Sequence, residues 1–284
     1  RSIDAINARL DAVEDLLQDS EFEKSFGKFA SRLPDIERII PRIYAGKCKP
    51  REFVGVLNAL SSLGQAVQGL KEQAEKHTND SIRSLLDTVP DVTKHLDELN
   101  NQFKINSDDS FHPKAGVHEE FDEAEAALNE IEADLEQERV DAAKLLKLPN
   151  NKVSFKHIGT KDIYQIEVPR TAKVPANWVS VSNTKDFARH YSPKCRTLVQ
   201  KLKEARETRL AALRSFSAVL FSTFCEYAPT FLRAVKAIAE LDCLLSLAKA
   251  SYAISHPRCR PTLVESSAAR IEFTSLRHPC IAAS

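Results

Sequence analysis

The hydrophobic period of this chain changes twice, and the change limits what the chain can fold into. Over residues 119–147, apolar side chains recur in alternating steps of three and four, which indicates a heptad seam on one helix of about 40 Å. Residues 152–182 instead alternate apolar with polar positions, as short strands do. Neither glycine nor proline occurs within residues 194–227, which predicts a second long helix. If the two helices pair antiparallel, the strands must lie at their far end.

The rest of the chain is predicted to be mainly helical. Helical spacing of apolar residues marks the segments 2–18, 34–45, 50–75 and 80–105, the last of them broken near Pro90. Pro229 is expected to end one helix and open another over residues 230–252, and residues 106–118 are predicted to be a loop. The expected fold class is mainly α, an elongated helical scaffold with a small antiparallel β insertion between two long helices.

The β insertion is predicted to have four strands. Residues 152–158 and 163–168 flank a turn that begins at Gly159, so they read as a hairpin. Residues 178–182 predict a third strand, and residues 185–191 a short fourth one. Aromatic side chains in these strands could stack on nucleic-acid bases, but in a sheet this thin they more often fill the core. They are Phe155, Tyr164, Trp178, Phe187 and Tyr191.

Charge is divided unequally between the insertion and the helix before it. Residues 150–196 hold nine lysines and arginines against three acidic residues, a net charge of +6, whereas half of residues 119–138 are acidic and none is basic. Such a division would direct a polyanion to the insertion and away from the helix. Binding would then go to phosphates, without sequence preference and with a steep salt dependence. The alternative is that these cations merely solvate an exposed hairpin.

Motifs for catalysis are missing. The sequence contains no GxxxxGK[ST] phosphate loop and no GxGxxG, GxSxG or HExxH motif. The acidic pairs in residues 119–138 are too regular for a tuned acid and base, so a solvated face is expected. Two clusters, His256 with Cys259 and His278 with Cys280, lack the ligands and spacing of structural zinc. We therefore expect no catalytic residue, metal or cofactor in this chain.

Composition narrows the class of protein further. No stretch approaches 18 uncharged apolar residues, and no signal peptide is visible. The six cysteines include no CxxC pair, which favours reduced thiols in a cytosolic or nuclear protein. The lack of any methionine suggests a fragment.

Several local strings stand out at residues 6–16, 33–38, 49–54, 113–116, 121–122, 164–168, 173–175, 189–192, 239–242, 245–248, 259–265 and 277–280. In this order they resemble the MutS family of DNA mismatch-repair proteins. The wording of 9–15 and 259–261 looks most like the eukaryotic MutS homologue 6 branch, the mismatch-reading subunit of the MutSα heterodimer. One departure concerns the insertion. Family members often carry a glycine just before the tyrosine of its second strand, and here Ile163 precedes Tyr164.

The resemblance implies a division of the chain and a function. It implies a helical core and lever over residues 1–149, a β clamp over 150–192, returning lever helices over 193–270 and the start of a truncated ATPase domain over 271–284. It implies a nuclear protein that binds the backbone of mismatch-containing duplex DNA and pairs with a subunit of the MutS homologue 2 type. The segment is not itself an enzyme in this interpretation. It couples DNA binding to an ATPase outside this chain, which uses ATP and magnesium. The predicted backbone contacts are Lys156, His157, Lys161, Lys185, Arg189 and His190. The rival is a coiled-coil tethering protein whose hairpin binds protein.

Overall fold

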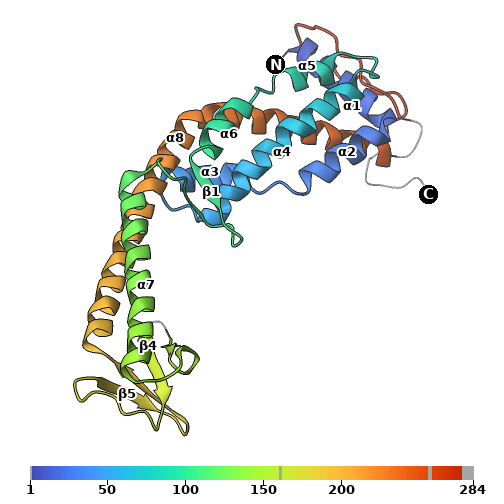
Figure 1. Ribbon diagram of the computed structural model, residues 1–284. Coiled ribbons are helices and arrows are strands. Elements are labelled where there is room, and N and C mark those ends of the chain that lie inside the picture. The colour runs from blue at the N-terminus through green and yellow to red at the C-terminus, as the bar shows by residue number, and fades with distance from the viewer. Residues whose placement is uncertain (1, 160–161, 255–257, 277–284) are drawn as a thin grey trace. The chain divides into compact units, whose positions relative to one another are not determined.

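The structure is a computed structural model that describes residues 2–159, 162–254 and 258–276. It divides into two compact units, of which unit 1 comprises residues 1–101, 105–110 and 221–284 and unit 2 comprises residues 102–104 and 111–220. Both units are mainly helical, and unit 2 also carries a four-stranded antiparallel sheet (Figure 1). The predicted fold class is therefore confirmed. Among the helices in the described ranges, none is both long and apolar enough for a membrane span.

Unit 1 packs its helices around α4. Its elements are α1 (Ile3–Gln18), α2 (Ser20–Ala30), α3 (Ile36–Tyr44), α4 (Pro50–Ala74), α5 (Ser81–Asp87), α6 (Thr93–Asn100) and the part of α8 (Pro193–Ala253) after residue 220. Proline stands in the first turn of α4, where its missing N–H costs nothing. The apolar stripe predicted for this helix is buried from Phe53 to Leu70. The ring of Phe53 meets two rings of α8, with centroids 4.9 Å from Phe221 and 5.5 Å from Phe224.

The predicted helix break at Pro229 is wrong, because α8 continues through this residue as one helix of 61 residues. A proline inside a helix has no N–H to donate, so the carbonyl four residues earlier loses its partner. That carbonyl belongs to Cys225, and it accepts a hydrogen bond of 3.1 Å from the hydroxyl of Tyr44. A side chain distant in the sequence thus replaces the missing donor.

Three further elements were missed by sequence reasoning, and one of them, a strand at Phe103–Ile105, replaces the end of the helical segment predicted over residues 80–105. Helix α2 follows α1 after a single residue, Asp19, and buries Phe22 and Phe26 one turn apart. The predicted loop at residues 106–118 contains strand β2 (Phe111–Pro113), which pairs with β1 (Phe103–Ile105) in a two-stranded sheet. Each strand has only three residues, too few for a period to show in the sequence.

Asp19 provides a test of how unit 1 depends on pH. Burial acts to raise the pKa of its carboxylate, but hydrogen bonds from the N–H groups of Phe22 and Glu21 and the side chain of His77 together lower the pKa below its ordinary value. A lowered folded-state pKa stabilises the fold above the unfolded pKa of about 3.9, and this contribution is lost as pH falls through the folded value. Asparagine still caps a helix N-terminus, so Asp19→Asn removes mainly the charge.

We expect Asp19→Asn to lower the unfolding free energy at pH 7 and to have a smaller effect at pH 3, where the unfolded carboxyl is already largely protonated. Urea denaturation of both proteins at the two pH values measures this difference. The loss at pH 7 follows from the 3.0 Å contact between the carboxylate and Nε2 of His77. An equal loss at both pH values would show that the charge of Asp19 contributes nothing.

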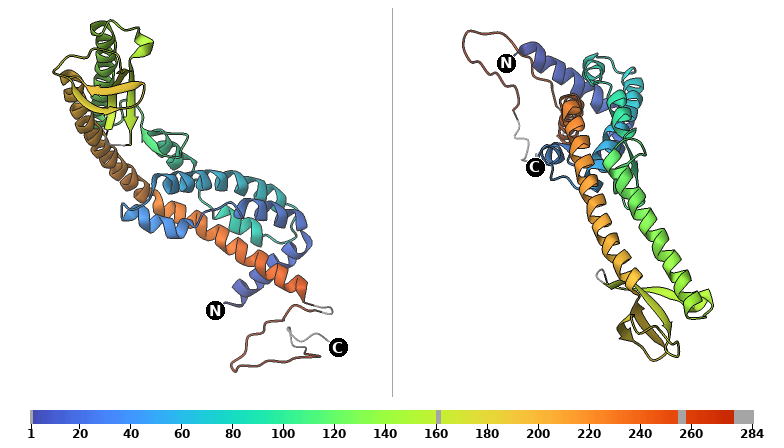
Figure 2. Two further views of the ribbon diagram at one scale, coloured as in Figure 1. Left: turned by 90° about the horizontal axis from the view of Figure 1, so that it is seen from below. Right: turned by 60° about the vertical axis from the view of Figure 1, so that its left-hand side comes forward.

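Unit 2 pairs two helices and places a sheet at their end. Helix α7 (Glu119–Leu145) lies beside the part of α8 that ends at residue 220, as all three views show (Figure 2). Between them the chain forms β3 (Ser154–Ile158), β4 (Asp162–Pro169), β5 (Val179–Asn183) and β6 (Phe187–Tyr191). The strand order is β3-β4-β6-β5, and neighbouring strands are antiparallel. All four predicted strands are present, and together they form the insertion between α7 and α8.

Candidate nucleic-acid interface

The sheet is attached to the two helices through one apolar core. Leu135 of α7 and Leu202 of α8 are fully buried in the same cluster as Ile166 and Val168 of β4. Val153 joins this cluster just before β3 begins. Since each element contributes side chains to one core, the sheet is held as part of unit 2.

Ion pairs along α7 and α8 fix the antiparallel register of the two helices. Going from the sheet along α7, Glu138 pairs with Lys194 at 3.6 Å, Glu132 pairs with Arg206 at 3.4 Å, and Glu125 pairs with Arg209. The guanidinium of Arg209 also lies over the ring of Phe121, 5.1 Å from its centroid. These pairs use part of the acidic charge predicted for the helix. They also show Phe121 buried in the helix packing, as expected.

Arg139 of α7 binds the backbone of the segment that leads into β3. Its Nη1 donates to the carbonyl oxygens of Asn150 and Val153, both at 3.0 Å, and its other nitrogens hold Glu136. The hydrogen bond from Arg139 lowers the pKa of the Glu136 carboxyl below its ordinary value. Sequence reasoning did not single out this arginine. It is the first basic residue after the acidic stretch, which was the available signal.

Exposed cations gather on the strands and turns of the insertion. Lys156 projects from the edge strand β3, and Lys185 lies in the turn between β5 and β6. Both are exposed, and neither forms an ion pair with a carboxylate among the described residues. Lys161 lies outside the described residues. Within residues 150–192, three further exposed cations contribute to the charge but were not named as site residues, namely Lys152, Arg170 and Lys173.

Two of the predicted contact residues are instead engaged within the sheet. The Nε of Arg189 donates to Glu167 across the β4–β6 pair at 2.7 Å, and both side chains are only 15% exposed. His190 is buried opposite Ile166, and burial lowers the pKa of its imidazole because it disfavours the charged form. Neither side chain is presented to solvent as a free cation.

Most aromatic residues of the insertion fill the core of the sheet and are not free to stack on nucleic-acid bases. Phe155, Tyr164, Trp178 and Tyr191 are half-buried and pack against the core cluster. Phe187 is the exception, with 41% of its surface exposed. One exposed ring on the sheet does not make a platform for successive bases.

Strand β4 contains a bulge at Ile163 and Tyr164, where family members often carry a glycine before the tyrosine. Lys156 pairs with Gln165 and Ile158 with Asp162, so two residues of β4 stand opposite His157 alone. Tyr164 takes the left-handed backbone conformation, with φ of 55°. That region favours glycine, since a Cβ there costs roughly 1–2 kcal/mol. In this chain the left-handed position falls on the tyrosine itself.

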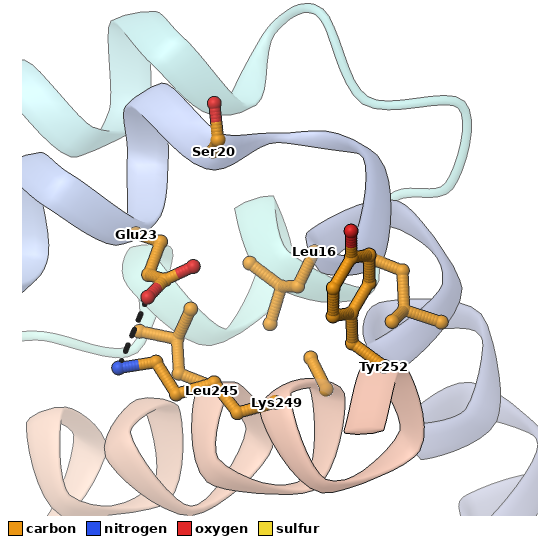
Figure 3. A pocket seen from close by; sticks show the side chains of 8 residues that line it. Leu16, Ser20, Glu23, Leu245, Lys249 and Tyr252 are labelled. Carbon is orange, nitrogen blue, oxygen red and sulfur yellow. Dashed lines mark ion pairs between the residues drawn. The ribbon is translucent and has the colours of Figure 1, made fainter. Parts of the chain in front are cut away.

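Unit 1 contains a cavity between α1, α2 and the last turns of α8, with a volume of about 330 Å³. Figure 3 shows side chains that line it. Three leucines and Tyr252 are among the eight residues that line it, and Glu23 is paired with Lys249 at 3.1 Å (Figure 3). In the described ranges, no three metal-binding side chains gather at one place. Of the two clusters that the sequence did not favour as zinc sites, His256, His278 and Cys280 fall outside those ranges, and Cys259 is an exposed free cysteine.

Unit 2 therefore consists of two long helices that share one apolar core with a small basic sheet. The family model for MutS domain III matches residues 1–248. The chain belongs to the MutS family.

Curated relatives agree with this assignment. The DNA mismatch repair protein MSH6 of Saccharomyces cerevisiae is 30% identical over 97% of this chain, and msh-3 of Neurospora crassa is 31% identical over 96%. Msh3 of Mus musculus is 30% identical over 97% of the chain. The chain spans only 23% to 25% of the length of these relatives. The predicted likeness to an MSH6-type MutS protein is confirmed, MSH3 proteins match at similar identity, and the coiled-coil tether is not favoured.

Proposed function

We propose that this chain is the lever and clamp segment of a DNA mismatch-repair protein, and that its sheet holds duplex DNA by the phosphate backbone. The observation that carries the proposal is a group of exposed cations, without an ion-pair partner among the described residues, on a sheet at the end of an acidic helix. Phosphates are attracted to the sheet and repelled by the face of α7. Such contacts position a duplex but read no bases.

Burial and pairing decide which residues we assign to the phosphates. Lys156, His157 and Lys185 are exposed and make the contacts in this proposal, with Lys161 as a further predicted contact. Arg189 already shares its charge with Glu167, so we assign it to holding β4 and β6 together. His190 is assigned the same structural role, because a buried neutral ring attracts no phosphate.

The lever role rests on α8 and on the segment that follows it. Helix α8 contributes Leu202 to the core of unit 2 and Leu241 to the core of unit 1. After the helix, Arg258 donates to the carbonyl oxygen of Ser251, and Arg260 pairs with Asp11 of α1 at 2.6 Å. Packed helices shift as units between discrete arrangements, which suits transmission between a clamp and a distant ATPase.

The wider setting of the protein also belongs to this proposal. The segment is assigned no catalysis of its own, and ATP and magnesium bind an ATPase domain outside it. Its partners are mismatch-containing duplex DNA and a second MutS-homologue subunit of the MutS homologue 2 type, in the nucleus. The relatives that support this setting are named as DNA mismatch repair proteins.

A salt titration of duplex binding tests the phosphate contacts. We expect the double variant Lys156→Ala, Lys185→Ala to bind a duplex more weakly and to flatten the plot of log affinity against log salt by about 0.9 for each phosphate that a lysine no longer neutralises. Between 50 and 200 mM salt the original chain should then lose about tenfold more affinity than the variant. Fluorescence anisotropy with a labelled duplex measures both quantities.

The matched control removes two lysines from unit 1, Lys47→Ala and Lys94→Ala, which are also exposed. This control changes the net charge by the same amount and should leave the slope as it was. If the two double variants behaved alike, the sheet would have no special role, and the proposed DNA clamp would be rejected.

A further inference from the structure

The imidazole of His157 is held in one orientation by the bulge in β4. Its Nδ1 accepts a hydrogen bond of 3.2 Å from the backbone N–H of Tyr164. The ring of Tyr164 stands perpendicular to the imidazole, with centroids 4.7 Å apart. Among the described residues, the side chain of His157 makes no second hydrogen bond.

The left-handed residue is held from several sides. The carbonyl oxygen of Tyr164 accepts from the thiol of Cys195 at 3.3 Å, and the hydroxyl of Tyr191 donates to the carbonyl of Ile163 at 2.8 Å. The ring of Phe155 packs edge-on against Tyr164 at 5.1 Å. Contacts from α8, β3 and β6 therefore keep the bulge in place, and the bulge in turn presents one N–H to His157.

This hydrogen bond determines where the proton on the imidazole lies. A nitrogen that accepts a hydrogen bond carries no proton, so a neutral ring in this position must have its proton on Nε2. A doubly protonated ring would have no acceptor for the N–H of Tyr164. His157 is an exposed residue of the edge strand β3, and a ring with its inner nitrogen occupied keeps the other available as a donor.

We infer that His157 is a neutral, single-proton donor to a DNA phosphate, with Nε2–H fixed outward by the bulge at Tyr164. The inference rests on the proposed DNA clamp and deepens it. Lysines act on phosphates through charge, whereas this imidazole donates one directed hydrogen bond and releases no counterion of its own. The strained residue serves to orient a donor in advance of binding.

The variant His157→Asn distinguishes the role of Nδ1 as an acceptor from the role of Nε2 as a donor. The amide oxygen of asparagine can accept the N–H of Tyr164 as Nδ1 does, but nothing remains in the place of Nε2. We expect an unfolding midpoint close to that of the original chain and a loss of duplex affinity of about tenfold, as for a hydrogen bond to a charged group. The salt slope should stay unchanged, in contrast to the lysine variants.

His118→Asn is the matched control in the same unit. Nδ1 of His118 accepts the N–H of Phe121 at 3.3 Å and caps α7, so the chemistry of the two histidines is alike. Asparagine is a good helix cap, so this variant should keep both its stability and its duplex affinity.

Long-range ¹⁵N–¹H NMR of the unmodified chain tests the orientation without any variant. We expect His157 to show a proton on Nε2 and a bare Nδ1 at neutral pH. A proton on Nδ1, a charged ring, or duplex binding by His157→Asn equal to that of His118→Asn would each overturn the inference. If the lysine variants weaken binding but His157→Asn does not, only this inference fails. If the lysine variants match their own control, the proposed clamp fails first.

Discussion

Leu241→Ala should lower the unfolding free energy of unit 1 by about 2–5 kcal/mol, the range for a leucine truncated in a well-packed core. Leu241 is completely buried on α8. Truncation of Leu241 removes apolar contacts and leaves a cavity. The surrounding side chains fill this cavity only in part, because the core is closely packed. Urea denaturation followed by circular dichroism measures the loss, because most of the helical signal comes from elements such as α4 and α8.

The same helix offers a matched control. Leu247 lies six residues further along α8 and is 53% exposed. Leu247→Ala makes the same chemical change with much less burial, so its cost should stay below about 1 kcal/mol. Equal losses for the two variants would mean that α8 does not bury Leu241 in the way the structure shows.

Ser192→Ala should destabilise unit 2 by about 2–4 kcal/mol, because one hydroxyl serves two buried partners. It accepts the backbone N–H of Cys195 at 2.9 Å, which caps the start of α8, and it donates to the carboxylate of Glu138 at 2.6 Å. Loss of a helix cap costs about 1 kcal/mol, and loss of a hydrogen bond to a charged group costs about 1.5–3 kcal/mol. Glu138 is only 8% exposed, so water replaces the hydroxyl poorly.

Trp178 reports this loss selectively. It is the only tryptophan in the chain, and it packs against the core of unit 2. Denaturation followed by tryptophan fluorescence should therefore shift to lower urea for Ser192→Ala. The control Ser180→Ala changes an exposed serine of β5, and it should change the unfolding free energy by less than about 0.5 kcal/mol. A fluorescence transition that is unchanged in Ser192→Ala would rule out the shared role of this hydroxyl.

Much of the candidate site followed from the sequence. The position of the sheet between two helices, its four strands and the exposure of Lys156 and Lys185 were all predicted from period and charge. The state of Arg189 was not, because its partner Glu167 lies on a different strand 22 residues earlier in the chain. Composition counts both charges, but only the pairing of β4 with β6 brings them together.

The sequence by itself determined where helices and strands occur in most of this protein. The stripe of α4, the heptad seam of α7 and the alternation of β4 come from backbone geometry, which sets a period of 3.6 in a helix and 2 in a strand. These patterns are local, so they are present in the sequence before any packing takes place.

Only the tertiary structure decided which interruptions matter. Pro229 does not break α8, because Tyr44, 181 residues from Cys225 in the chain, donates to the carbonyl that the proline leaves open. Tyr164 takes a conformation that glycine would favour, because contacts from α8, β3 and β6 hold it there. The physical reason is the same in both cases: a local cost of one or a few kcal/mol is offset by partners that the fold brings together from distant parts of the chain.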